Sequence, residues 1–414
     1  MKRTGILAGV IISFSIFNFQ FSISAPRDVR IDSMRMMRAV DSIVTAAIEA
    51  HAFPGCQLFV ARGGKTEIDK SFGHHDYSCK TPVENDHLYD LASVTKMAAS
   101  TIALARLADQ RAIDLDDRLS KFYPPLRATD KGDITFREVL SHRSGLPSGI
   151  PRPWLFTRDS LLAAICSVAM RTPGLYRYSD LPFLLVPQIV RTADRKGRDF
   201  ETFLAEEFYH PMETGLVFNP LGKGVPPEKI VPTEEDTYWR GTPEVPVAVH
   251  GTVHDESAAV LGGVSGNAGL FGSARDLAAV MQMLLDGGLY DGVRYLSPRT
   301  IDIFTSRHYP AEENRRALGF DRPLPGNDTL PFDEAYPAPA VSQSSFGHTG
   351  FTGTFAWADP EFDLVYVFLC NRVTPSRRNE AFVDTRVRYA LQQAVYEALH
   401  LSGEASRAES QRGR

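Results

Sequence analysis

Strand-forming runs lie near both ends of this chain, and a long helical stretch lies between them. Near the amino end, residues 56–61 and 66–72 flank a Gly-Gly pair, which is typical of a β-hairpin. Near the carboxyl end, residues 353–358 and 364–369 form two further strand-like runs. Because the runs from both ends must meet in one core, the order predicts an α+β fold. One antiparallel sheet would receive an inserted all-helical lobe, at about residues 93–216.

Helices are predicted to flank this sheet on the amino-terminal and carboxyl-terminal sides. Residues 33–51 and residues 379–399 each carry apolar side chains at helical intervals. Residues 364–369 are continuously apolar, as in a central strand that is covered on both faces. We therefore expect one large domain over residues 26–402.

Two polar, proline-containing segments interrupt the regular pattern. Residues 219–249 and 305–345 are poorly periodic, so we expect surface excursions, and the second is a candidate for the rim of a cleft. Residues 262–271 are rich in glycine. For them we favour the packing of a tight loop between the lobes over a close approach to a ligand.

Composition excludes some classes of partner. The 414 residues are 43% hydrophobic and 23% charged, with a net charge of −5 and no basic cluster, so nucleic acid is not an expected partner. His250 and His254 are four residues apart, but Pro246 and Gly251 disfavour a metal-binding helix there. We predict neither a metal nor a cofactor.

The first 25 residues resemble a secretory signal peptide. Lys2 and Arg3 precede a largely apolar run, and small residues follow at Ser22, Ser24 and Ala25. We expect a secreted or periplasmic protein, with a membrane tether only if this segment stays uncleaved. At the other end, residues 403–414 are polar and are expected to form a disordered tail.

The four cysteines give no metal or redox motif. Cys56, Cys166 and Cys370 lie in apolar runs and are expected in the core. Cys79 does not lie in an apolar run. Export would permit disulfides, and the pairing stays open.

A candidate nucleophile lies in the pattern Ser93-x-x-Lys96, at the expected start of a helix that runs on to Leu104. Residues three apart share a helix face, so the Lys96 ammonium would lie against the Ser93 hydroxyl, and a neighbouring base is the usual activator of serine. The N–H groups of a helix start also favour developing negative charge. The same pattern also occurs by chance on solvated helices.

Two more clusters could meet Ser93 in a cleft between the helical lobe and the sheet. One is Tyr178-Ser179-Asp180, in a loop between helices, and the other is His348-Thr349-Gly350, just before a strand. His142 is a weaker catalytic candidate, since histidine often caps a helix end. Arg372 follows the central strand and either reaches an anionic group in the cleft or lies in solvent.

In this order, the three clusters resemble the motifs of the serine β-lactamase and penicillin-binding protein superfamily. That superfamily carries S-x-x-K, then Y-x-N, then K-T-G or H-T-G. The segments 89–96 and 141–147 are also similar to the sequence that surrounds the motifs in that superfamily. The resemblance is closest to the class C β-lactamase-like branch, which includes D,D-peptidases and esterases, and it covers nearly the whole chain.

The resemblance implies a role for each motif residue. Ser93 would be the nucleophile, Lys96 would accept or relay its proton, and Tyr178 would shuttle a proton to the leaving group. To act as a base, Tyr178 would need a pKa well below about 10, which Lys96 could supply. The backbone N–H groups of Ser93 and Phe351 would form the oxyanion hole.

This chain departs from the family pattern at two positions. Asp180 stands where an asparagine amide is common, and it could pair with Lys96 or cap the following helix. His348 stands where β-lactamases carry lysine, so a substrate carboxylate would be held less strongly by the His348-Thr349-Gly350 strand. Both departures reduce the β-lactamase activity that we expect.

The resemblance therefore implies an exported serine hydrolase that cleaves an amide or ester through an acyl-serine intermediate. A penicillin-binding D,D-carboxypeptidase acting on cell-wall peptides is the first expectation. A small-molecule esterase or a weak β-lactamase of the same fold is the second. A non-enzymatic penicillin-sensing or scaffold protein is the third.

Overall fold

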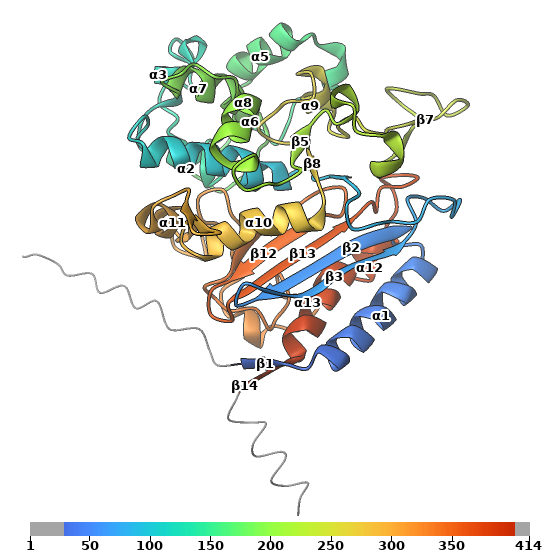
Figure 1. The fold of residues 1–414 in the computed structure, drawn as a ribbon. Helices are drawn as coiled ribbons and strands as arrows, with labels where there is room; N and C mark the ends of the chain where they lie inside the picture. Colours follow the sequence, from blue (N-terminus) through green and yellow to red (C-terminus); the bar gives the residue numbers. More distant parts are fainter. Residues whose placement is uncertain (1–28, 402–414) are drawn as a thin grey trace, which may run out of the picture.

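The protein is described by a computed structural model over residues 29–401 (Figure 1). The expected signal peptide at residues 1–25 and the expected tail at residues 403–414 lie outside the described residues. Within the described part, no helix has both the length and the apolar character that a membrane crossing requires.

A five-stranded antiparallel sheet forms the centre of the molecule. Its order is β11-β12-β13-β2-β3, so strands from the two ends of the chain lie side by side, as the sequence predicts. The strands are β2 (Gly55–Arg62), β3 (Lys65–Gly73), β11 (Phe346–Thr349), β12 (Phe355–Asp359) and β13 (Leu364–Cys370). The central strand β13 pairs with β2 on one side and with β12 on the other.

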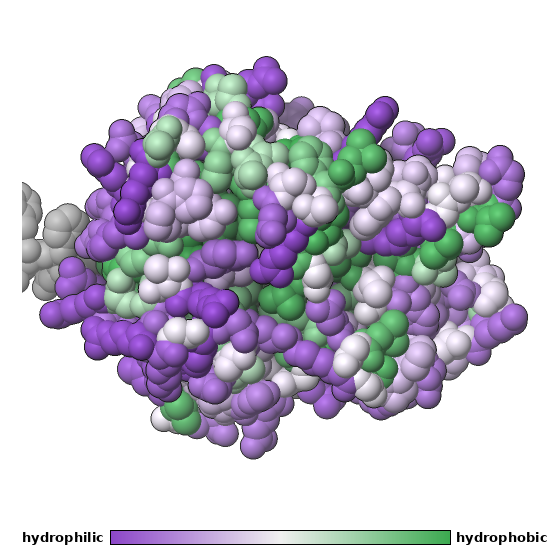
Figure 2. Space-filling view, turned by 90° about the horizontal axis from the view of Figure 1, so that it is seen from above, coloured by the Kyte–Doolittle hydropathy of each residue, from purple (hydrophilic) through white to green (hydrophobic). Residues whose placement is uncertain are grey.

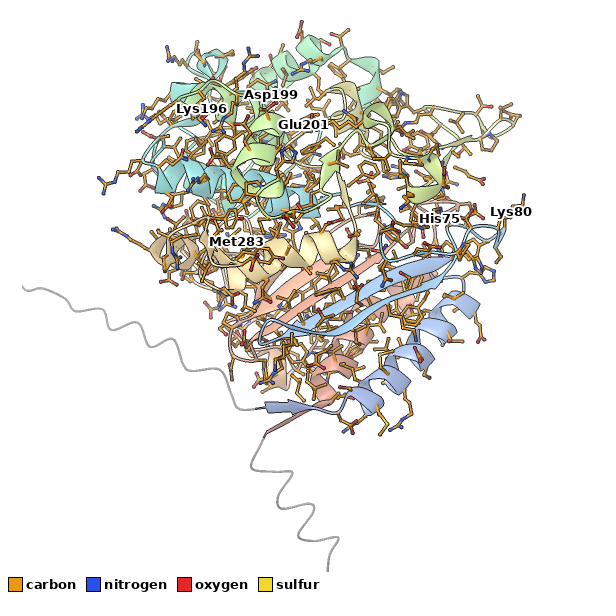
Figure 3. All side chains as sticks on the ribbon, in the orientation of Figure 1. His75, Lys80, Lys196, Asp199, Glu201 and Met283 are labelled. Atoms are coloured by element: carbon orange, nitrogen blue, oxygen red, sulfur yellow. The ribbon has the colours of Figure 1, made fainter. Side chains whose placement is uncertain are left out.

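Helices cover both faces of this sheet. On one face lie α1 (Ser33–Glu49), α12 (Ala381–Asp384) and α13 (Val387–Glu397), and on the other lies α10 (Ala274–Leu285) (Figure 1). Met283 on α10 is buried between the sheet and the helical lobe (Figure 3). The side chains of β13 follow this layering. Tyr366 and Phe368 pack with α1 and α13, and Val365 and Val367 pack with α10.

Between β4 and β8 the regular elements are mostly helices joined by long irregular segments. The α-helices here are α2 (Ile102–Asp109), α3 (Leu119–Phe122), α4 (Phe136–Leu140), α5 (Arg158–Ser167), α6 (Leu181–Leu184), α7 (Val186–Ala193), α8 (Phe200–Leu204) and α9 (Glu256–Val260), with α11 (Pro298–Thr305) after α10. A small sheet of β4 (Tyr89–Asp90), β8 (Leu270–Gly272) and β5 (Val217–Phe218) joins this part to the segment before Ser93. Seen from the helical side, the surface is mostly polar, with hydrophobic residues in small groups (Figure 2).

Short strand pairs complete the described chain. They are β1 (Val29–Ile31) with β14 (Leu399–Leu401), β6 (Glu235–Asp236) with β7 (Val247–Ala248), and β9 (Leu289–Tyr290) with β10 (Val293–Arg294). The β6–β7 hairpin lies in the expected excursion at residues 219–249 and projects from the helical side of the molecule (Figure 1). That excursion is not wholly superficial, because Ile230 and Val231 in it are buried.

Two local predictions need correction. The expected single helix over residues 379–399 is broken into α12 and α13, because Arg386 between them adopts a left-handed conformation at φ +48°. Cys166 is half-buried rather than in the core, whereas Cys56 and Cys370 are buried and lie opposite each other on β2 and β13. All four cysteines are free.

Candidate active site

Ser93 lies in a turn between a strand and a helix. The preceding segment is fixed by β4 and by the Leu91 N–H, which donates to the Leu270 carbonyl at 3.0 Å. Ala92 adopts φ +47°, an uncommon conformation for a residue with a side chain. The helix begins just after Ser93, not with it as predicted, and residues Lys96–Thr101 are π-helical before α2 follows. Such π-helical turns are frequent at functional sites.

Lys96 is fully buried behind Ser93. Its Nζ donates to Ser93 Oγ at 2.9 Å and to the Asn267 carbonyl at 3.2 Å, and it lies 2.6 Å from Asp180 Oδ1. Burial alone would lower the pKa of Lys96, but the charges of Asp180 and Tyr178 outweigh it and raise that pKa above its ordinary value. In the resting enzyme Lys96 is therefore an ammonium that donates to Ser93.

The carboxylate of Asp180 is the ion partner of this lysine. Asp180 is the N-cap residue of α6, but its side chain makes no capping hydrogen bond, so the capping alternative is wrong. Its side chain is 31% exposed and lies between the buried lysine and solvent. A carboxylate here compensates a buried charge that an asparagine amide would leave unpaired.

The pKa of Tyr178 is raised overall and does not fall as a base would require, although Lys96 acts on it in the expected direction. The Lys96 ammonium lies 5.0 Å from the centroid of the Tyr178 ring. Burial raises the pKa of Tyr178 most; Lys96 and Arg316 lower it, and Asp180 raises it again. Tyr178 is therefore a neutral phenol at neutral pH, which is a proton donor.

His142 supports Tyr178 from behind. The two rings stack with centroids 4.3 Å apart, and His142 Nδ1 accepts a hydrogen bond from the Ser179 N–H at 3.2 Å. The pKa of His142 is lowered well below its ordinary value, chiefly by burial, so the ring is neutral. No contact with Ser93 is found, so His142 positions Tyr178 rather than meeting the reacting atoms.

The turn between β11 and β12 is bonded directly to the Ser93 segment. Thr352 Oγ1 donates to the Asp90 carbonyl at 2.8 Å, and Thr354 Oγ1 donates to the Leu91 carbonyl at 2.9 Å. At Gly350 the backbones approach so closely that a Cβ would lie 2.6 Å from the Leu91 oxygen. The turn that carries Phe351 is thus held against the turn that carries Ser93.

Two backbone N–H groups on these turns are free. Within the described chain, neither the Ser93 N–H nor the Phe351 N–H donates to any protein acceptor, although both residues line the same pocket. Fixed, unoccupied donors of this kind are what a tetrahedral oxyanion requires.

His348 is neutral, and a buried arginine lies beside it. Burial lowers the pKa of His348 to about 3, and its Nδ1 hydrogen-bonds to the Thr349 carbonyl at 2.7 Å. Arg316 Nη1 lies 3.5 Å from His348 Nε2, and Arg316 also pairs with Asp321 at 2.6 Å. The positive charge that a lysine would bring at position 348 is thus supplied by Arg316.

The site opens into a pocket of about 440 Å³ that is rich in arginine. Its lining comprises Ser93, Tyr176, Tyr178, Arg315, Arg316, Asp321, Tyr336, His348, Thr349, Gly350, Phe351, Arg372, Phe382, Val383 and Arg388. Arg372 Nε donates to the Phe351 carbonyl at 2.8 Å, and Arg388 Nη2 donates to the Gly350 carbonyl at 3.0 Å. Among the described residues neither guanidinium has a carboxylate partner, so both can bind an anion.

The structure therefore brings all eight predicted site residues together. Ser93, Tyr178 and the segment 348–351 line the pocket, Lys96 lies behind Ser93, and Asp180 bonds to Lys96. Arg372 also faces the pocket. The sequence analysis missed Arg316 and Arg388, which lie outside any motif. It also missed the Asn267 carbonyl, although the glycine-rich loop around it was a usable signal.

Histidines outside the pocket have structural partners. His250 Nε2 bonds to the Pro227 and Ile230 carbonyls, and His254 Nε2 bonds to Glu234 at 2.9 Å. One group in the described chain, Glu84 with Asp86 and His87, has ligand atoms close enough for a cation, but Asp86 already pairs with Lys229. This group is not among the residues that line the pocket.

The fold and the site together have the form of a serine hydrolase, with a serine and a lysine in contact beside two free backbone N–H groups. Comparison with known proteins gives the same class. The sequence profile described as Beta-lactamase matches residues 40–388, and the chain belongs to that family of serine hydrolases.

Curated relatives cover most of the chain. An N-acetylmuramyl-L-alanine amidase of Bacillus subtilis (strain 168) is 30% identical over 376 residues, 82% of this chain and 82% of its own. A protein of Escherichia coli (strain K12) with the provisional name D-alanyl-D-alanine carboxypeptidase is 30% identical over 408 residues, 90% of this chain and 91% of its own. Among solved structures, a penicillin-binding protein homologue from Caulobacter crescentus aligns with a TM-score of 0.67 at 21% identity. That alignment covers 90% of this chain and all of the other, and it supports the β-lactamase-like fold.

Proposed function

We propose that the protein is an exported hydrolase that cleaves an amide of a cell-wall peptide through an acyl-Ser93 intermediate, in the manner of a D,D-carboxypeptidase. One observation carries the proposal. Ser93 Oγ lies 2.9 Å from the buried Lys96 Nζ, in the same pocket as two free N–H donors. A nucleophile, a proton carrier and an oxyanion site are the parts that acyl transfer needs.

The charges of the resting site suggest how protons move. As Ser93 Oγ attacks the carbonyl carbon, its proton passes to Lys96, while Lys96 passes a proton to Asp180 at 2.6 Å. The carbonyl oxygen becomes an oxyanion between the N–H groups of Ser93 and Phe351. Tyr178, protonated at rest, donates its proton to the leaving nitrogen as the C–N bond breaks and later regains one from Asp180 through Lys96. Water then releases the acyl group from Ser93.

The pocket favours a substrate that carries a carboxylate. His348 is neutral, so anion binding falls to Arg372 and Arg388 beside the oxyanion turn and to Arg316 beside His348. A peptide with a free carboxyl terminus or an acidic side chain meets this requirement. One curated relative is provisionally named D-alanyl-D-alanine carboxypeptidase and another is named N-acetylmuramyl-L-alanine amidase, and both names denote cleavage of an amide bond.

Export remains part of the proposal. It rests on the charged start, apolar run and small residues within residues 1–25, followed by the enzyme domain at residues 26–402. Cell-wall peptides lie outside the cytoplasm, so location and substrate agree.

The test is intact mass of the purified protein after incubation with a fluorescent penicillin, in parallel with Ser93→Ala. We expect a stable adduct on the wild type and none on Ser93→Ala. Rapid loss of free penicillin without an adduct would identify a β-lactamase instead. Cleavage of a short-chain ester alone, lost in Ser93→Ala, would identify an esterase. If the protein formed no adduct, consumed no penicillin and cleaved no ester, the result would contradict enzymatic function.

A further inference from the structure

Four aromatic side chains, two partly exposed and two exposed, lie in a row beside the pocket, which we term the aromatic strip: Trp154, Trp239, Tyr238 and Phe351. Trp154 stacks on Trp239 with centroids 6.0 Å apart and meets Tyr238 edge-on at 5.6 Å. Tyr238 is 43% exposed and Phe351 is 47% exposed. Large aromatic rings at such exposure are unusual unless they bind something.

The turn that carries two of these rings is rigid. Asp236 is fully buried, and its carboxylate accepts hydrogen bonds from the N–H groups of Tyr238 at 2.9 Å, Trp239 at 3.0 Å and Arg240 at 3.1 Å. The Arg240 guanidinium lies over the Trp239 ring, 4.0 Å from its centroid. The outer rings are therefore pre-organised.

The strip is continuous with the proposed oxyanion hole. The Arg377 guanidinium lies 4.8 Å from the Tyr238 ring and 5.9 Å from the Phe351 ring, so it bridges the two. Its charge is compensated by Glu234 at 2.6 Å and Glu256 at 2.8 Å. Because the N–H of Phe351 faces the reacting carbonyl in the proposed function, a ligand on the strip adjoins the scissile bond.

We propose that the aromatic strip is a subsite for the sugar portion of a glycan-linked wall peptide. Sugars present apolar C–H faces, which pack on aromatic rings, and hydroxyl edges, which bond to charged groups such as Arg240, Arg377 and Glu256. A lipid or an apolar peptide would cover these charged groups without offering them hydrogen bonds in place of water. The proposal rests on the proposed function and narrows its substrate from a free peptide to a peptide still attached to its glycan.

Binding can be measured without turnover, so that the two proposals are tested separately. In a Ser93→Ala background, sedimentation with insoluble peptidoglycan sacculi should show that Trp239→Ala weakens binding about five-fold or more. Trp239→Tyr, which keeps a stacking ring, should restore most of it. Peptide-free glycan strands should compete with the sacculi.

Two controls separate a subsite from a folding defect. Val293→Ala alters an exposed apolar side chain, 50% exposed, on β10 and should leave sacculus binding unchanged. Trp239→Ala with Ser93 intact should unfold thermally within a few degrees of wild type. The proposal is overturned if Trp239→Ala binds sacculi as tightly as its parent, or if only free peptides compete. A missing penicillin adduct on wild type would instead count against the proposed function alone.

Discussion

At the scale of single residues, Asp180 decides the charge of the catalytic lysine. A buried lysine without an acidic partner tends to lose its proton, which suits a base. Here the carboxylate of Asp180, 2.6 Å away, keeps the pKa of Lys96 high. In the proposed mechanism the lysine must release one proton before it can accept another, so Asp180 belongs to the proposed proton path.

Asp180→Asn should therefore change the pH dependence of acylation. Without the carboxylate, burial dominates and the pKa of Lys96 falls, so more of the enzyme holds a neutral amine at neutral pH. In the variant, Lys96 must be neutral to accept the Ser93 proton, so the rate of Ser93 acylation by an activated ester should gain an acidic limb that falls about tenfold per pH unit below the pKa of Lys96; wild type should lack this limb, because Asp180 takes the proton of the lysine. Stopped-flow rates across pH 5 to 10 measure it.

Asp117→Asn is the matched control for that experiment. It removes a carboxylate from an ion pair with Lys121 at the surface, and it should leave the acylation profile unchanged. If the acylation rate of Asp180→Asn had the same pH dependence as that of wild type, Lys96 would not govern this pH dependence.

The motif residues were accessible to sequence reasoning because each lies in a short pattern with its own chemistry. Arg316 was not, and His142 was named without its contact to Tyr178, since no local pattern encodes these contacts. Arg316 reaches His348 from a polar loop, and His142 stacks on Tyr178 from the end of a helix. The pKa of Tyr178 is raised because burial outweighs the lowering by Lys96 and Arg316, and the motif does not show the extent of that burial.

At the scale of elements, the turn between β11 and β12 places one of the two proposed oxyanion donors. The hydroxyls of Thr352 and Thr354 and the absence of a side chain at Gly350 hold it against the Ser93 segment. A displacement of the turn would move the Phe351 N–H while leaving the sheet intact.

Gly350→Ala should separate catalysis from stability. The new Cβ would lie 2.6 Å from the Leu91 oxygen, so the turn must shift away from Ser93. We expect the maximal acylation rate to fall about 100-fold or more, as for the loss of one oxyanion donor. Thermal unfolding should stay within a few degrees of wild type.

Gly222→Ala controls for the substitution itself, because a Cβ there meets nothing within 4 Å. Its acylation rate should match wild type. A Gly350→Ala enzyme of normal activity would place the oxyanion elsewhere.

Most helices and strands could be predicted from the spacing of apolar residues, because long amphipathic helices and continuous apolar strands have strong local signals. The failures occur where backbone conformation departs from local preference. Arg386 interrupts the last helix in a left-handed conformation, and Lys96 lies in π-helical rather than α-helical geometry. Both are imposed by tertiary packing.

At the scale of the whole molecule, an ion cluster ties the middle of the chain to its carboxyl end. Glu234 bonds to His254 at 2.9 Å and to Arg377 at 2.6 Å. Burial alone would raise the pKa of Glu234, but these partners lower it to about 2. A lowered folded-state pKa stabilises the fold above the unfolded-state pKa and loses that stabilisation as pH falls through the folded value.

Glu234→Gln should remove this acid-sensitive part of stability. At pH 7 we expect the free energy of unfolding to drop by about 1–3 kcal/mol. The difference from wild type should shrink between pH about 4.5 and 2, where the wild-type carboxylate becomes protonated. Urea unfolding at several pH values measures it, and a difference that stays constant with pH would contradict the assignment.

The order of strands in the central sheet has a consequence for the newly made chain. Ser93 is synthesised early. Strand β2 can pair with β13 only after β13 has been synthesised, and Phe351 follows β11 in the chain. A ribosome-bound chain that ends before β11 therefore lacks one of the two proposed oxyanion donors and leaves one edge of β2 unpaired. Under the proposed function, such a chain cannot carry out acyl transfer for most of its own synthesis.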